Sequence, residues 1–322
     1  MDKMHMRIAL GLSALTALGV ATALADAPAS QPVTAQESRP HSISMERAEQ
    51  WTMKSKAGRV FEISIARPSG AAPEHGYPVM YVLDPNTAFA TLVDAVRNQQ
   101  PMFGPVVVVG VGYASDAEIE NRSYDLTPPT DPKDLPAGPP AGWGANGGND
   151  AFLSFIIDDL KPAIAKKVTV DPGRQALFGH SLGGLFVLHA LFSQGEAFDT
   201  YIAGSPSIWW GKKSILREVA AFKAAQEKSK APKRLLITVG ELEAVGSPEE
   251  IRLGKAMHVD ADSLMRNAKQ VANSEDLAKD LAPLGQYGLK VQRVLFADET
   301  HASVIPAYLG RGARFTLQGW FE

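Results

Sequence analysis

The chain carries two kinds of apolar pattern, which predict two kinds of strand. Apolar and polar positions alternate in residues 44–54 and 59–66, and a short polar turn separates them, so we expect an antiparallel hairpin. Later runs are almost continuously apolar, which is typical of strands that helices cover on both faces. Such runs occur at residues 78–83 and 105–111, and further strands are expected at 175–178, 200–204, 234–239 and 290–296.

Helical runs alternate with the buried strands. They fall at residues 86–99, 151–168, 182–193, 214–228, 261–284 and 303–318. A hairpin followed by alternating helices and buried strands predicts an α/β fold with a doubly wound, mostly parallel sheet of about eight strands. The N-terminal hairpin would form its antiparallel edge.

Residues 127–150 match no element, because proline and glycine interrupt the stretch throughout. A loop of this length inside a domain is usually functional or disordered. Trp143, in its second half, favours a loop that folds over something apolar, such as a substrate. The stretch is therefore a possible lid, with a solvated insertion as the alternative.

The N-terminus has the pattern of an export signal. Lys3 and Arg7 precede an apolar run that ends in small residues at 23 and 25. We expect a cleaved signal peptide over 1–25, with an uncleaved anchor as the alternative. A flexible leader at 26–41 and one domain at 42–322 would follow, and the protein would be periplasmic or secreted.

Composition narrows the function classes. The 322 residues are 45% hydrophobic, enough for one large core, and the formal net charge of -3 provides no basic field for nucleic acid. The absence of cysteine excludes thiolate catalysis, disulfides and cysteine-bound zinc.

The pattern Gly-x-Ser-x-Gly occurs at residues 179–183, between the strand expected at 175–178 and the helix expected at 182–193. In this strand–turn–helix setting the serine oxygen is exposed at the edge of the sheet, and the helix N-terminus faces it. Ser181 is therefore the predicted nucleophile. The alternative is a turn that merely caps a helix.

A serine nucleophile needs a base and a group that orients the base, and with this turn the acid precedes the histidine in the chain. Among His189, His258 and His301, only His301 directly follows a predicted strand, so we expect it to be the base. The acid should follow the strand 234–239, where Glu241 and Glu243 are both available.

The oxyanion hole should use two backbone N–H groups, one of them that of Leu182. The loop after the first buried strand should supply the other, and Asn86 is favoured because Pro85 has no N–H. No histidine pair at helical spacing carries a glutamate base, so we expect neither a metal nor a cofactor.

Several segments together resemble the esterase D branch of the α/β-hydrolases, and within it the periplasmic esterases that open the trilactone of catecholate siderophores such as enterobactin and salmochelin. These segments are G-H-S-L-G-G-L-F, S-P-S-I-W-W at 205–210, N-R-S-Y-D-L-T-P at 121–128, V-L-D-P-N at 82–86 and V-G-E-L-E. The resemblance extends from about residue 43 to the C-terminus.

The resemblance implies the α/β-hydrolase fold and the roles already assigned to Ser181 and His301. It leaves the acid open, because some siderophore esterases act with a Ser-His dyad. The usual glycine in L-D-G-N is Pro85 here, and the usual R-x-R-D lacks its second arginine. Arg122 is then a candidate substrate contact, with a salt bridge to Asp125 as the alternative.

Tyr124, Trp209 and Trp210 complete the predicted substrate contacts, since tryptophans can stack on a catechol or another aromatic group. As core residues the tryptophans would need no ligand. The predicted function is hydrolysis of a siderophore ester, whose iron would belong to the substrate. The alternatives are a general acyl esterase or thioesterase, and a non-catalytic chelate-binding protein on a hydrolase scaffold.

Overall fold

An eight-stranded sheet forms the centre of the fold, in the order β1-β2-β4-β3-β5-β6-β7-β8. The hairpin pair β1/β2 and the pair β2/β4 are antiparallel, and all other neighbours are parallel. The strands are β1 (Ala48–Lys54), β2 (Val60–Ala66), β3 (Tyr77–Leu83), β4 (Val107–Gly112), β5 (Val170–His180), β6 (Thr200–Gly204), β7 (Lys233–Gly240) and β8 (Leu289–Phe296). The predicted α/β architecture with an antiparallel N-terminal hairpin is confirmed.

This computed structural model describes residues 44–114, 118–136, 143–256 and 260–321. The expected signal peptide and leader lie outside the described residues. One compact unit, Met45–Glu322, contains the whole sheet. Within the described ranges, no helix is long and apolar enough to cross a membrane.

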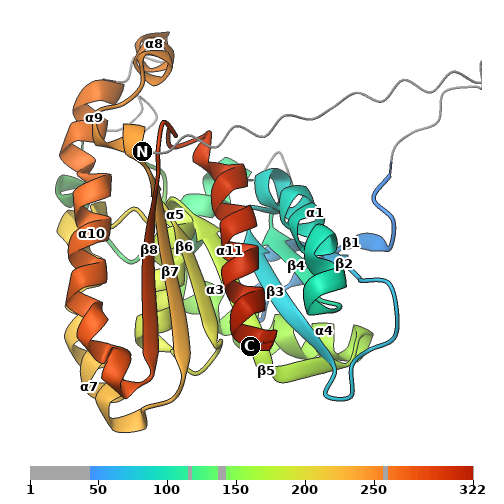
Figure 1. Cartoon of the computed structure of the whole chain (residues 1–322). Coiled ribbons are helices and arrows are strands. Elements are labelled where there is room, and N and C mark those ends of the chain that lie inside the picture. The colour runs from blue at the N-terminus through green and yellow to red at the C-terminus, as the bar shows by residue number, and fades with distance from the viewer. Residues whose placement is uncertain (1–43, 115–117, 137–142, 257–259, 322) are drawn as a thin grey trace, which may run out of the picture. The chain divides into compact units, whose positions relative to one another are not determined.

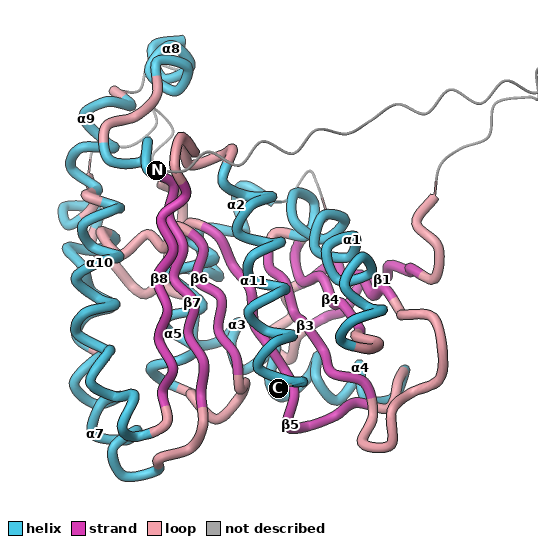
Figure 2. Tube along the Cα trace, in the orientation of Figure 1, coloured by secondary structure: helices cyan, strands magenta, loops and turns pink. Residues whose placement is uncertain are grey.

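Helices cover both faces of the sheet (Figures 1 and 2). On one face lie α1 (Pro85–Phe103) and α11 (Val304–Phe321), which pack against each other. On the other face, core contacts involve α3 (Asn149–Ser154), α5 (Leu182–Ser193), α7 (Val219–Ser229) and α10 (Gln270–Leu281).

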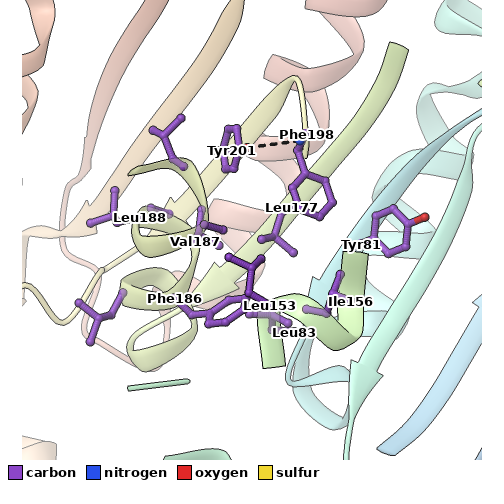
Figure 3. Close-up of a cluster of buried hydrophobic side chains, with 14 of the residues drawn as sticks. Tyr81, Leu83, Leu153, Ile156, Leu177, Phe186, Val187, Leu188, Phe198 and Tyr201 are labelled. Carbon is purple, nitrogen blue, oxygen red and sulfur yellow. Dashed lines mark hydrogen bonds between the residues drawn. The ribbon is translucent and has the colours of Figure 1, made fainter. Parts of the chain in front are cut away.

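Alternation along each strand supplies the two cores. In β3, Tyr81 and Leu83 face the cluster under α3 and α5, while Met80 and Val82 face α1 and α11. Figure 3 shows the first cluster, in which the backbone N–H of Phe198 donates to the hydroxyl of Tyr201 at 3.3 Å. Because both faces of the inner strands β3, β4, β6 and β7 are buried, these strands are mostly apolar, whereas the edge strands β1 and β8 are partly exposed.

The helix predicted at 151–168 is continuous but not uniform. It consists of α3, a π-helical turn at Phe155–Leu160 and α4 (Lys161–Lys167). Pro162 explains the change, because it has no N–H for the preceding turn and its ring crowds the carbonyl four residues earlier.

Two other helix predictions were only partly right. Residues 261–284 split into α9 (Ala261–Ala268) and α10, because Lys269 between them adopts a left-handed conformation with φ 48°. Residues 214–217 form a 3-10 turn, after which α7 begins at Val219.

Further short helices were not predicted, because their apolar positions are few. They are α2 (Glu118–Leu126), α6 (Trp210–Lys213) and α8 (Pro248–Ala256), together with the 3-10 turns Pro132–Asp134 and Glu241–Ala244; a further 3-10 turn, Ala282–Tyr287, begins within the end of the helix predicted at 261–284. The turn Pro132–Asp134 lies inside the stretch that sequence reasoning left without any element, and α3 begins before that stretch ends.

Candidate active site

Ser181 lies in a strained turn between the end of β5 and the start of α5, with φ 59° and ψ -116°. Its N–H donates to the carbonyl of Gly204 at 2.9 Å, which fixes the turn against β6. A Cβ atom at Gly179 would lie 2.3 Å from the carbonyl oxygen of Gly183, so only glycine fits there. The Gly-x-Ser-x-Gly motif therefore has the predicted strand–turn–helix context.

A chain of hydrogen bonds runs from this serine to a buried carboxylate. The Oγ of Ser181 lies 2.9 Å from Nε2 of His301, whose Nδ1 lies 2.7 Å from Oε2 of Glu243. His301 follows β8 and Glu243 follows β7, so both come from loops at the carboxyl edge of the sheet. A serine, a histidine and an orienting carboxylate in this order can activate the hydroxyl as a nucleophile.

The structure separates the two glutamates that sequence reasoning left open. Glu243 is fully buried, whereas Glu241 is exposed and accepts from the backbone N–H of Asp298 at 3.2 Å. Only Glu243 contacts His301. His189 instead lies 3.0 Å from Glu218, and His258 lies outside the described residues.

Three donors converge on the carboxylate of Glu243. Its Oε1 accepts from the N–H of Gly240 at 2.7 Å and from the hydroxyl of Ser205 at 2.6 Å, while Oε2 faces His301. The 3-10 turn that carries Glu243 is also tied to the histidine loop, because Leu242 N donates to the carbonyl of Glu299 at 3.0 Å. The carboxylate is thus held at both oxygens.

The two predicted oxyanion donors lie at the starts of two helices on opposite faces of the sheet, which follow the neighbouring strands β3 and β5. Leu182 is the first residue of α5, and Asn86 is the second residue of α1. The helix starts are close together, since a Cβ atom on Gly183 would lie 3.3 Å from a carboxylate oxygen of Asp84. The positive ends of both helix dipoles favour negative charge at this point.

The alternative pairing of Arg122 with Asp125 is wrong. Arg122 instead forms a two-pronged ion pair with Asp84, at 2.7 and 2.8 Å. Asp125 is bound by Arg59 at 2.6 Å and by the Tyr113 hydroxyl at 2.8 Å. Arg122 therefore braces the loop before α1, and its contact with a substrate stays a prediction.

His180, the residue before the nucleophile, forms a wall behind the base. Its ring centroid lies 4.6 Å from that of His301 and 5.6 Å from that of Tyr308. Burial, together with the neighbouring His301 and Arg122, holds the pKa of His180 well below its usual value. His180 is thus a neutral ring that packs against the base.

The predicted aromatic contacts divide into two groups. Trp210 is fully buried and donates to Thr130 Oγ1 at 2.9 Å, so the prediction that it stacks on a substrate is wrong. Trp209 is half-buried, and its ring centroid lies 5.3 Å from that of Trp143 in the Pro/Gly-rich stretch. Both rings pack against the core and are only partly buried, so a substrate contact at Trp209 stays a prediction.

Tyr124 is accounted for without a ligand. Its ring lies 4.7 Å below the guanidinium of Arg59, and a Cβ atom on Gly148 would lie 2.3 Å from the ring. The ring therefore fills the space between Arg59, just before β2, and Gly148, near the end of residues 127–150. A substrate contact at Tyr124 has no support from these neighbours.

Sequence reasoning missed two serines in the S-P-S segment after β6. Ser205 contacts Glu243, and Ser207 Oγ lies 3.4 Å from Ser181 Oγ. Both are buried. Their position in the sequence could have identified them as site residues. Polar residues directly after a buried parallel strand lie at the carboxyl edge of the sheet, where the other site residues lie.

No cluster of three or more histidine, cysteine, aspartate or glutamate side chains suited to a metal ion occurs among the residues that the structure describes.

The fold and this hydrogen-bonded chain define the class: the protein is a serine hydrolase of carboxylic esters with the α/β-hydrolase fold. Residues 55–273 match the Esterase family, described as "Putative esterase". The chain belongs to this family.

Similar proteins that are named as siderophore esterases agree with this assignment. The ferri-bacillibactin esterase BesA of Bacillus subtilis is 38% identical over 80% of this chain and 85% of its own. The siderophore enterobactin esterase of Emericella nidulans is 35% identical over 82% of this chain and 92% of its own. The crystal structure of the BES protein from Bacillus cereus superposes with a TM-score of 0.73 at 36% identity, covering 87% of this chain and 99% of that one.

Proposed function

We propose that the protein hydrolyses the ester bonds of a siderophore, with Ser181 as nucleophile, His301 as general base and acid, and Glu243 as the residue that orients and stabilises the histidine. The observation that carries the chemistry is the hydrogen-bonded chain from Ser181 through His301 to Glu243, at 2.9 and 2.7 Å.

In this mechanism His301 Nε2 removes the proton from Ser181 Oγ as the oxygen attacks the ester carbonyl. The backbone N–H groups of Leu182 and Asn86 stabilise the oxyanion. His301 then donates its proton to the departing alcohol. Water, activated by the same nitrogen, releases the acid from Ser181, so one histidine serves both half-reactions.

The siderophore substrate is supported by relatives named for ferri-bacillibactin and enterobactin esterase activity. The half-buried pair Trp143 and Trp209 supports an aromatic acyl group, because a partly exposed indole ring can stack on a catechol ring. A general acyl esterase is the second candidate, since the site chemistry alone does not select an acid.

A substrate panel tests the proposal. The purified protein is given a catecholate trilactone with and without iron, and short p-nitrophenyl esters, and products are identified by mass spectrometry. We expect kcat/KM on one form of the trilactone to exceed that on the short esters. A preference for the short esters would instead support the general esterase.

Covalent labelling tests the nucleophile separately. A fluorophosphonate should label the wild-type protein and not Ser181→Ala. Labelling that survives this substitution would refute the role of Ser181, whatever the substrate panel shows.

Export is part of the proposal and rests on the N-terminal pattern. Residues 1–25 would direct the chain out of the cytoplasm and be removed after Ala25. Fractionation of cells that express the full chain, with mass spectrometry of its N-terminus, tests this. A cytoplasmic chain that retains residues 1–25 would contradict it.

A further inference from the structure

The side chain of Glu243 has one more rotatable bond than that of an aspartate, so fixing its carboxylate costs more conformational entropy. Glutamate places an additional methylene between the backbone and the carboxylate, so an orienting role requires that the group be fixed by contacts of its own. In this protein Glu243 is fully buried, and its Oε1 accepts hydrogen bonds from Gly240 and Ser205. The donor of Gly240 is its backbone N–H, whereas the donor of Ser205 is its side-chain hydroxyl, which a mutation can remove.

Ser205 itself is held rigidly. It follows β6 directly, is fully buried and adopts φ 40°, a conformation that residues other than glycine rarely adopt. Its N–H donates to the carbonyl of Thr238 in β7 at 2.8 Å. Its own carbonyl accepts from the side-chain amide of Gln270 in α10. The backbone on both sides of Ser205 is therefore fixed.

Strain of this kind persists only where the surrounding contacts determine it. Here the contacts direct the hydroxyl of Ser205 at Glu243 Oε1, with 2.6 Å between the two oxygens. This distance is typical of a hydroxyl that donates to a carboxylate. The other carboxylate oxygen is then left for Nδ1 of His301, at 2.7 Å.

We propose that Ser205 is a positioning residue of the hydrolase: its hydroxyl fixes the carboxylate of Glu243 and thereby orients His301. This inference rests on the proposed roles of Ser181, His301 and Glu243. Ser205 does not contact Ser181 or His301 by any hydrogen bond that the described residues show. Its effect on the reaction passes through Glu243.

The test is Ser205→Ala, with Ser205→Cys as a second variant, whose thiol is slightly larger and a weak donor and should therefore not restore the loss. We expect kcat on a p-nitrophenyl ester to fall about tenfold to a hundredfold, the usual effect of losing a hydrogen bond to a charged or orienting group. KM should change by less than about twofold, because the buried Ser205 cannot contact substrate.

Rates are normalised to active sites by fluorophosphonate titration, so that unfolded protein does not count. Ser274→Ala is the matched control, because Ser274 is another fully buried serine, lies in α10 and bonds to Val271 and Arg293. Its kcat per active site should equal that of the wild type.

A double-mutant cycle shows whether the effect passes through the carboxylate. In a Glu243→Ala background, Ser205→Ala should change kcat by less than about twofold, because the group that it positions is gone. An unchanged kcat in Ser205→Ala, or an equal loss in both backgrounds, would overturn the proposal. If the proposed function itself were wrong, the result would be different, because Ser181→Ala would then retain activity.

Discussion

Replacing Glu243 with glutamine tests the catalytic arrangement most directly, because the amide has the same shape as the carboxylate. Two donors, the N–H of Gly240 and the hydroxyl of Ser205, face Oε1 at 2.7 and 2.6 Å. The amide oxygen of Gln must occupy that position. The amide NH2 group then faces Nδ1 of His301, where the carboxylate previously accepted a hydrogen bond.

This orientation forces His301 into the wrong tautomer. A donor opposite Nδ1 requires Nδ1 to be the acceptor, so the proton moves to Nε2, which faces Ser181 at 2.9 Å. Flipping the amide would leave the buried N–H of Gly240 without an acceptor, at about 1–3 kcal/mol. Restoring the tautomer of His301 that acts as the base therefore destabilises the variant by this amount.

We expect Glu243→Gln to lower kcat/KM by a factor of about 10³ to 10⁴, which corresponds to about 4 to 5.4 kcal/mol of transition-state stabilisation. Part of this loss arises because the amide no longer stabilises the imidazolium form of His301. Because the hydrogen bonds at Oε1 are kept, the free energy of unfolding should change by less than about 1.5 kcal/mol.

The assay is hydrolysis of a p-nitrophenyl ester, with urea denaturation of each variant. Glu241→Gln is the control: it lies two residues earlier, is exposed and should retain wild-type kcat/KM. If folded Glu243→Gln keeps more than about a tenth of wild-type kcat/KM, His301 acts with Ser181 as a dyad, and the tautomer argument fails.

Three further predictions concern stability, and urea denaturation measures each. Gly179→Ala should destabilise the fold by at least about 2 kcal/mol, because the Cβ atom would lie 2.3 Å from the carbonyl oxygen of Gly183; an unchanged midpoint would contradict this packing. Arg122→Gln should cost about 3 kcal/mol, because the carboxylate of Asp84, only 10% exposed, loses its ion-pair partner. The exposed Arg252→Gln should cost less than about 1 kcal/mol, and equal losses would refute the burial argument. Burial lowers the pKa of Lys161 to about 8 from 10.5. Between these two pH values the unfolded chain binds more protons than the folded chain does. The free energy of unfolding should therefore rise with pH over this range, by at most about 3 kcal/mol. Lys161→Met should lack this rise, and a rise of equal size in this variant would exclude Lys161 as its cause.

Local patterns were sufficient for most of the fold. Continuous apolar runs predicted the parallel strands because both faces of such a sheet are buried, and alternation predicted the hairpin at its edge. Errors arose where one residue changed the backbone locally. Pro162 inserts a π-helical turn into a continuous helix, and left-handed Lys269 divides another.

The sequence by itself determined the nucleophile motif and the choice of His301, because a glycine-flanked serine between a strand and a helix, and a histidine after the last strand, are local features. It did not distinguish Glu243 from Glu241, nor did it show that Ser205 contacts the acid. Those contacts join the ends of β6, β7 and β8, which are far apart in the chain. Only the register of the sheet and the turn after β7, which buries Glu243 and exposes Glu241, decided which side chains meet.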